Sequence, residues 1–331
     1  MKPLPIPQVS LLPDVSPVVA FTSPRVAVLM STYQGARYIT EQLQSVLAQL
    51  PAQGTVIVRD DGSSDETVAK IAALADLRVN VVQGPNLGFG QSFLTLLARA
   101  PVDVDMVMFA DQDDVWLPGK IERAWQQLSA LGDVPALYGS AQMLADQDLR
   151  PLKTSWRPPR GPSFTNALTE NIIVGCTTAI NRPAVKILQR AGIPPGLRFH
   201  DWWIYLVVSA LGVVTYDEEA TLLYRQHDAN VIGRHPGRVA GFRRAWKVII
   251  RNDWLGSLFR QIHAFLGNYG DLLSPEDKMR VARYFYKQQK QTTPRWSLIF
   301  SLVRWRQLLK DELILRCMLA LYKLGLLRGP G

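Results

Sequence analysis

The chain has 331 residues, of which 47% are hydrophobic, and it carries a formal net charge of +9. This length provides enough apolar material for one large domain with an appended region, which excludes a small scaffold held together by disulfides. The two cysteines, Cys176 and Cys317, stand far apart and outside any CxxC or Cys/His spacing. The sequence therefore indicates neither a zinc site nor a disulfide framework, and we expect a reducing compartment.

Residues 1–24 read as a proline-rich leader, "MKPLPIPQVSLLPDVSPVVAFTSP". They contain one early lysine and no uninterrupted apolar run of the kind found in secretory signals. We expect a flexible leader ahead of a folded domain that covers residues 25–240.

Strand-like and helix-like segments alternate from residue 26 onward. Short apolar runs predict strands over 26–30, 55–58, 79–82 and 106–110. Apolar residues at helical spacing predict helices over 39–50, 63–75 and 92–100, the second of which opens on a possible capping box of Ser63 and Glu66. This βαβ alternation predicts an α/β fold, Rossmann-like, with a mainly parallel central sheet and helices on both faces.

Polar clusters follow three of the predicted strands. "STYQG" comes after the first strand, "RDDGSSD" after the second and "DQDD" after the fourth. Ligands of such sheets bind at the carboxyl ends of the strands, so these clusters are expected to meet in one crevice. The carboxylates of Asp111, Asp113 and Asp114 would repel one another unless a cation lies among them. The pattern therefore predicts a cation site.

The positive charge lies entirely in the C-terminal part of the chain. Residues 1–240 hold 20 Lys and Arg against 22 Asp and Glu, whereas residues 241–331 hold 17 against 6 and are net +11. The same region is rich in large apolar residues, but its apolar stretches fall short of the roughly 20 residues that a spanning helix needs. We predict basic amphipathic helices on an anionic membrane surface. A helical bundle whose basic face is merely solvated is the alternative.

Five segments, in this order and spacing, resemble family 2 glycosyltransferases of the GT-A fold. The nucleotide-sugar half of that family is matched by residues 26–49, 56–71, 86–93 and 106–122, and "HDWWIYLVVSALGVVTYDEEATLLYRQHDANVIG" is similar to the acceptor half of its bacterial rhamnosyltransferase-like branch. The resemblance covers about residues 25–235. It implies a GT-A domain over 25–240, followed by the basic helical region of 241–331.

The resemblance implies a Mg²⁺ or Mn²⁺ ion that bridges the donor diphosphate. It makes Asp113 the metal ligand, as the last acid of the D-x-D motif Asp111-Gln112-Asp113. Asp111 would lie toward the ribose and the metal, Gln112 belongs to the same donor-binding motif, and Asp114 would hold the donor sugar or a water molecule. A solvated turn is the alternative for these acids.

For the nucleotide base, the resemblance implies contacts with Asp60 or Asp61 and packing against Thr32 and Tyr33. The base would be uracil or thymine. Asp-Gly is also an ordinary turn dipeptide, so one of the two aspartates could be structural.

On the acceptor side, the resemblance makes Asp201 the catalytic base that takes a proton from the attacking hydroxyl. An aspartate at a helix start is also a common cap. His200, Trp202 and Trp203 are predicted to contact the acceptor, although one tryptophan could belong to the core. Gly175 would allow close approach to the acceptor pocket, and its neighbour Cys176 is expected to be buried and inert.

Two residues of "YRQHDANVIG" complete the predicted site. Arg225 is expected to reach the diphosphate, and His227 the metal. Processive family members carry a Gln-x-x-Arg-Trp motif here, which this sequence lacks. We therefore expect the addition of one or a few sugars.

These features predict a metal-dependent inverting glycosyltransferase of bacterial surface polysaccharide synthesis, peripheral to the cytoplasmic face of the cell membrane. The predicted donor is dTDP-rhamnose or a UDP-sugar, and the predicted acceptor is a glycan or a lipid-linked glycan. A sugar nucleotidyltransferase is an alternative, but "STYQGARY" has only one glycine where such enzymes have a glycine-rich stretch. Nucleic-acid binding through the basic tail is a second alternative, which would leave the DQDD and HDWW motifs unexplained.

Overall fold

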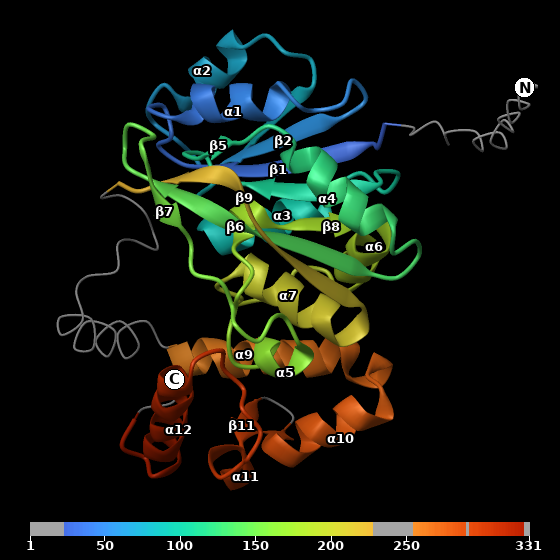
Figure 1. The fold of residues 1–331 in the computed structure, drawn as a ribbon, viewed down its shortest axis with the longest axis vertical. Helices are drawn as coiled ribbons and strands as arrows, with labels where there is room; N and C mark the ends of the chain where they lie inside the picture. Colours follow the sequence, from blue (N-terminus) through green and yellow to red (C-terminus); the bar gives the residue numbers. More distant parts are fainter. Residues whose placement is uncertain (1–22, 228–253, 289–290, 328–331) are drawn as a thin grey trace, which may run out of the picture.

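The computed structural model describes residues 23–227, 254–288 and 291–327. Within them, nine strands form one curled sheet, helices flank it, and a largely helical C-terminal region lies at one end of the molecule (Figure 1). The predicted α/β class is confirmed. Most of the predicted leader, and the predicted boundary at residue 240, lie outside the described residues.

The first half of the sheet is parallel. It consists of β1 (Val26–Thr32), β2 (Thr55–Asp60), β3 (Val79–Gln83) and β4 (Met106–Ala110). In the register of the sheet, Thr32 pairs with Asp60 and Met30 pairs with Ala110. The carboxyl ends of β1, β2 and β4 therefore meet at one edge, as the alternation predicted.

The second half makes the sheet mixed. It contains β5 (Val115–Trp116), β6 (Ala136–Ala145), β7 (Pro151–Thr154), β8 (Ala179–Asn181) and β9 (Val213–Arg225). Strand β8 pairs antiparallel with both β4 and β6, and β9 runs parallel to β6. The strict βα alternation ends at residue 110, and the short connection from β6 to β7 permits only antiparallel pairing. The prediction of a mainly parallel sheet therefore holds for the first half alone.

Helices cover both faces of the sheet because alternate strand residues point to opposite sides. One face carries α1 (Ile39–Leu47), α2 (Thr67–Ala73) and α4 (Lys120–Ser129), and the other carries α3 (Phe89–Ala98), α6 (Arg182–Arg190) and α7 (His200–Leu211). On β1, Val28 and Met30 join the core under α1, whereas Leu29 joins the core under α3. The short helices α5 (Phe164–Ala167) and η1 (Gly175–Thr177) lie in the connections.

The start of α2 differs from the predicted capping box. Asp65 Oδ1 accepts a hydrogen bond from the Thr67 N–H at 3.1 Å, and the Ser63 hydroxyl instead donates to Asp60 Oδ1 at 2.5 Å. Ser63 therefore belongs to the turn after β2, and the capping-box prediction is wrong. Asp65 instead satisfies the N–H of Thr67, the first residue of α2.

The C-terminal region packs directly on α7. It contains α9 (Trp254–Tyr269), η2 (Gly270–Leu272), α10 (Pro275–Tyr284), the hairpin β10 (Phe285–Lys287) and β11 (Thr292–Pro294), α11 (Trp296–Ile299) and α12 (Leu309–Lys323). Buried residues of α9 and α12 belong to the same apolar core as those of α7. In the part of the chain that the structure describes, no helix has the length and apolar character needed to cross a membrane.

Candidate active site

The loops after β1 and β4 are joined by one amide side chain. Gln112 Oε1 accepts hydrogen bonds from the Thr32 hydroxyl at 2.7 Å and from the Tyr33 N–H at 2.9 Å. Thr32 is buried, whereas the Tyr33 ring is exposed and available to a ligand. The structure thus brings together three of the predicted donor-site residues.

The two aspartates after β2 are both buried and both have partners. Asp60 Oδ2 accepts hydrogen bonds from the N–H groups of Gly62 and Ser63, at 3.1 and 2.9 Å. Asp61 forms an ion pair with Arg59 and accepts the Leu87 N–H at 3.0 Å. Asp60 therefore stabilises the turn itself, in keeping with the expectation that one of the pair is structural, and the base contact of this loop remains a prediction.

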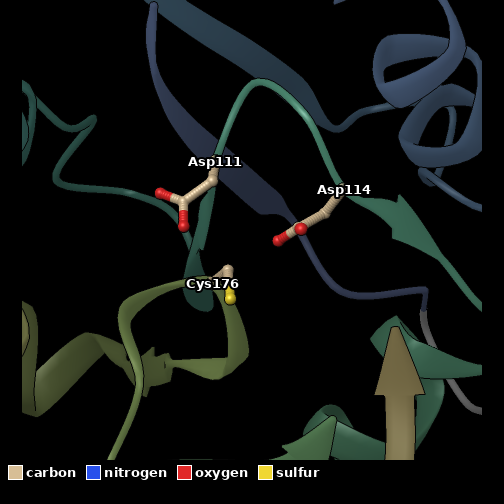
Figure 2. A group of neighbouring side chains, drawn as sticks. All are labelled: Asp111, Asp114 and Cys176. Carbon is tan, nitrogen blue, oxygen red and sulfur yellow. The ribbon is translucent and has the colours of Figure 1, made fainter. Parts of the chain in front are cut away.

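Carboxylates crowd the loop between β4 and β5. Burial, with the charges of Asp113 and Asp201, raises the pKa of Asp111 to about 7. Burial, with the charges of Asp111 and Asp113, raises the pKa of Asp114 well above its usual value. The side chains of Asp111 and Asp114 converge with that of Cys176, with one atom of each lying within 4.8 Å of the others (Figure 2). Such mutual repulsion is relieved when a cation binds.

The donor set of this loop fits a hard divalent cation. Asp113 Oδ2 lies 2.8 Å from His227 Nε2, so these two predicted metal ligands are side by side. Asp114 Oδ2 is buried without a hydrogen-bond partner among the described residues. Mg²⁺ and Mn²⁺ prefer carboxylate oxygens, and histidine is the commonest metal ligand of all.

Cys176 does not extend this donor set. Burial and the nearby acids raise the pKa of its thiol well above the usual value, so the sulfur stays protonated at neutral pH. Gln142 Nε2 donates to its Sγ at 3.2 Å. Cys176 is buried, as predicted, but it lies at the carboxylate cluster, a position that its sequence context did not indicate.

Arg225 holds the DQDD loop against α1. Its Nε donates to the Asp113 carbonyl at 2.8 Å, its Nη2 donates to Glu41 Oε2 at 2.6 Å, and its guanidinium stacks 4.5 Å from the centre of the Tyr38 ring. The side chain is buried. In this structure the donors of Arg225 are bonded to the protein, and its contact with the diphosphate after loop closure remains a prediction.

Asp201 faces the donor loop from the start of α7. Its charge contributes to the raised pKa of Asp111, which indicates that the two carboxylates lie near one another. Asp201 Oδ2 accepts the Gly175 N–H at 3.1 Å, and Oδ1 accepts the Trp202 N–H at 2.7 Å. Burial raises the pKa of Asp201 to about 6, although these backbone hydrogen bonds oppose the rise. A carboxylate with a pKa just below neutrality is suited to general base catalysis.

His200 lies in the core and does not face an acceptor. Its ring stacks on Phe93 with 4.1 Å between ring centres, and neither ring nitrogen has a hydrogen-bond partner among the described residues. Burial lowers the pKa of His200 to about 3, so the imidazole is neutral. A Cβ at Gly175 would lie 2.8 Å from His200 Nε2. The close approach predicted at Gly175 is thus made by His200, and both acceptor-contact predictions are corrected.

Both tryptophans of the HDWW motif are also buried. Trp202 Nε1 donates to the Ala167 carbonyl at 2.7 Å, and its ring stacks on Trp254 of α9. Trp203 packs on Tyr269 of the same helix. The predicted contact with the acceptor is corrected for both tryptophans, because each ring packs between α7 and the C-terminal region.

Lys120 is a buried cation that the sequence analysis missed. Its Nζ donates to the Thr221 hydroxyl at 3.0 Å and lies 5.1 Å from the centre of the Trp116 ring. Burial lowers its pKa to about 8, while Cys176 and Asp114 oppose this change. A lysine at the first position of a helix ordinarily lies in solvent. Its position soon after the acidic motif was the only feature of the sequence that pointed to a place near the site.

Comparisons with known proteins agree with this site. Residues 27–187 match the family model described as "Glycosyl transferase family 2". The dTDP-rhamnosyl transferase RfbG of Shigella flexneri is 27% identical over 245 residues, which cover 68% of this chain and 80% of that protein.

Two solved structures share the fold at low sequence identity. The S. aureus TarS 1-349 complex with UDP-GlcNAc is 16% identical, with a TM-score of 0.52 and 77% of each chain covered. The mannosyltransferase PcManGT of Pyrobaculum calidifontis, in complex with GDP-Man and Mn²⁺, is 18% identical, with a TM-score of 0.50 and 79% of each chain covered. The family model, the RfbG similarity and the shared GT-A fold together identify this chain as a glycosyltransferase whose residues 27–187 form a family 2 region.

Proposed function

We propose that this enzyme transfers one sugar, with inversion, from a nucleotide diphosphate donor to a hydroxyl of a glycan acceptor in bacterial polysaccharide synthesis. The observation that carries the proposal is the position of Asp201. Its carboxylate accepts the Gly175 N–H, and the thiol of the next residue, Cys176, lies within 4.8 Å of the Asp111 and Asp114 carboxylates. A base close to the donor-binding loop is what a single displacement requires.

The cation would be held by Asp111, Asp113 and His227. A divalent ion supplies a positive charge that stabilises the diphosphate leaving group. The unpartnered Asp114 Oδ2 and the 2.8 Å contact between Asp113 and His227 support this assignment. Mn²⁺ in the PcManGT complex is a further indication that the fold accommodates such an ion.

The protein side chains supply binding and proton transfer. The exposed Tyr33 ring and the loop of Asp60 and Asp61 would receive the nucleotide. The carboxylate of Asp201 takes the proton from the acceptor hydroxyl, whose oxygen forms the new bond to the anomeric carbon. The bond from that carbon to the diphosphate breaks on the opposite face, and its electron pair leaves with the nucleoside diphosphate.

We propose dTDP-rhamnose as the donor, with a UDP-sugar as the alternative. The support is the similarity to RfbG, which extends over 68% of this chain and 80% of that protein. We further propose that the acceptor is lipid-linked and is reached at the inner face of the cell membrane. The basic charge of residues 241–331 supports that location.

The test is a thermal-shift screen of the full chain against dTDP-rhamnose, UDP-sugars and GDP-mannose, with Mn²⁺ or with EDTA. Ligands that bind only the folded state raise its apparent stability. We expect a Mn²⁺-dependent shift with dTDP-rhamnose that is lost in Asp113→Ala. A shift with GDP-mannose alone would overturn the donor assignment, and equal shifts in EDTA would overturn the metal assignment.

A further inference from the structure

Large apolar side chains are exposed in unusual number around α11 and α12. Eight of them, all at least 40% exposed, occur between residues 296 and 326. We call them the α11–α12 surface, and they are Trp296, Phe300, Leu302, Val303, Leu309, Leu313, Leu324 and Leu326. Single exposed apolar residues are ordinary, whereas a concentration of this size on one part of a protein marks an interaction site.

Helix α12 is apolar on two faces. Leu315, Met318 and Leu319 are buried in the core. On the other side, Leu309 and Leu313 are 61% and 56% exposed, and residue spacings of four place them on one stripe of the helix. A helix that only completes the core needs a single apolar stripe. The exposed stripe of α12 contributes nothing to packing within the described residues.

Contacts between the two helices bring the exposed rings of α11 against α12. The rings of Trp296 and Phe300 stack with 6.2 Å between centres, and Lys323 Nζ of α12 lies 5.9 Å from the centre of the Trp296 ring. Arg316 Nη1 of α12 donates to the Ile299 carbonyl of α11 at 3.2 Å. Figure 1 shows these helices at the end of the molecule opposite α1 and α2.

Cationic side chains border this surface. Lys310 is exposed next to Leu309, and neither it nor Lys323 forms an ion pair with a described residue. The flexible stems of such lysines can lie along apolar surface while the ammonium groups contact phosphate. Tryptophan, here Trp296, is enriched at the boundary between headgroups and acyl chains.

We propose that the α11–α12 surface docks on an anionic lipid bilayer, with its apolar side chains entering the headgroup region and Lys310 and Lys323 contacting lipid phosphates. The combination of an apolar stripe and flanking lysines matches an interfacial helix better than a protein partner, because a protein interface would not require an excess of positive charge. Membrane docking itself does not depend on the proposed function. Only its purpose, which is access to a lipid-linked acceptor, rests on that function.

The test is flotation of the full chain with vesicles of phosphatidylcholine alone or with 30% phosphatidylglycerol. We expect binding to the anionic vesicles only, and at least a tenfold weaker partition for the double variant Leu309→Glu/Leu313→Glu. The matched control is Leu77→Glu/Leu152→Glu, which introduces the same charge at side chains that are 99% and 58% exposed elsewhere. We expect the control to bind as the wild type does.

Three outcomes would overturn the proposal. These are equal binding to neutral vesicles, unchanged binding of the α12 double variant, and equal losses in both double variants. Sedimentation velocity tests the competing occupant, since a wild-type dimer that the α12 variant dissociates would assign the surface to a second copy of the chain. Vesicle binding needs no turnover, so the donor-dependent thermal shift of each variant shows separately whether the active site is intact.

Discussion

Replacing Asp201 with asparagine is expected to stabilise the protein while it abolishes transfer. Burial raises the pKa of this carboxyl from 3.8 to about 6, so holding it ionised in the fold costs stability at neutral pH. Asparagine has nearly the same shape and carries no charge. The variant therefore replaces the catalytic base with a neutral side chain, whose place in the site costs less folding free energy.

The size of the effect follows from the pKa of Asp201. A rise of about 2.2 in pKa corresponds to about 3 kcal/mol at pH 7.5, an upper bound because the side chain keeps some solvent contact. Asparagine can accept one of the two backbone N–H groups through its oxygen but loses the other bond, at a cost of about 1 kcal/mol. The net gain is about 2 kcal/mol, or a rise of about 3 °C in the Tm of a 331-residue chain.

The sign of the pH dependence is fixed by which state binds the proton more tightly. Between the unfolded pKa of 3.8 and the folded pKa of about 6, the folded wild type holds a proton that the unfolded chain has released, so wild-type stability falls as pH rises through this window. At pH 5.0 the cost of the charge falls to about 1–2 kcal/mol, and the net gain of the variant shrinks to about 1 kcal/mol or less.

Thermal melts in EDTA at pH 7.5 and 5.0 measure this effect. The matched control is Asp217→Asn. Burial of Asp217 is outweighed by hydrogen bonds from Glu219, Tyr138 and Arg123, which lower its pKa, so its replacement should destabilise the protein at pH 7.5. Transfer by Asp201→Asn should fall by about 10²–10⁴-fold with donor binding retained. A Tm below that of the wild type at pH 7.5, or transfer close to the wild-type rate, would refute the assignment.

Three further substitutions test other parts of the site. Asp113→Ala should weaken nucleotide binding at least tenfold in Mn²⁺ but not in EDTA, as measured by calorimetry; equal affinities in Mn²⁺ would exclude Asp113 as a ligand. Gly175→Ala should lower the free energy of unfolding in urea by about 1–3 kcal/mol, because its Cβ would lie 2.8 Å from Nε2 of the buried His200. In the control Gly267→Ala the new Cβ meets no atom within 4 Å, so the free energy of unfolding should rise by up to about 1 kcal/mol. Arg225→Lys should lower both Tm and donor affinity, since one ammonium cannot reproduce the guanidinium contacts, and unchanged melts would show that the DQDD loop is held by other groups.

The first half of the fold was predictable because each strand there is followed by a helix with a clear apolar period. The second half was not, because β5 has only two residues and β8 only three. Such short strands form through pairing with distant neighbours, and no local pattern encodes them. The capping prediction at Ser63 failed for a related reason, since Asp60 competes for the serine hydroxyl.

At the site, the acidic motifs were predictable and the roles of the larger side chains were not. Asp113 and His227 come together as the resemblance implied, although 113 residues separate them in the chain. His200, Trp202 and Trp203 were placed at the acceptor because they adjoin Asp201 in sequence. Adjacent residues of a helix point in different directions, so only Asp201 faces the crevice while its neighbours enter the core.

The molecule departs in two places from the rule that charges lie outside and apolar groups inside. At the site it withdraws the carboxylates of Asp111, Asp114 and Asp201 from water, Asp114 fully and the other two in part, and their pKa values rise. In the C-terminal region, α11 and α12 leave large apolar side chains exposed to water. Each departure costs folding free energy, and neither adds to the packing of the core. Departures of this kind are typical of functional sites. Under the function and the docking surface proposed above, a cation and its donor would compensate the charge at the site, and a bilayer would cover the exposed apolar surface.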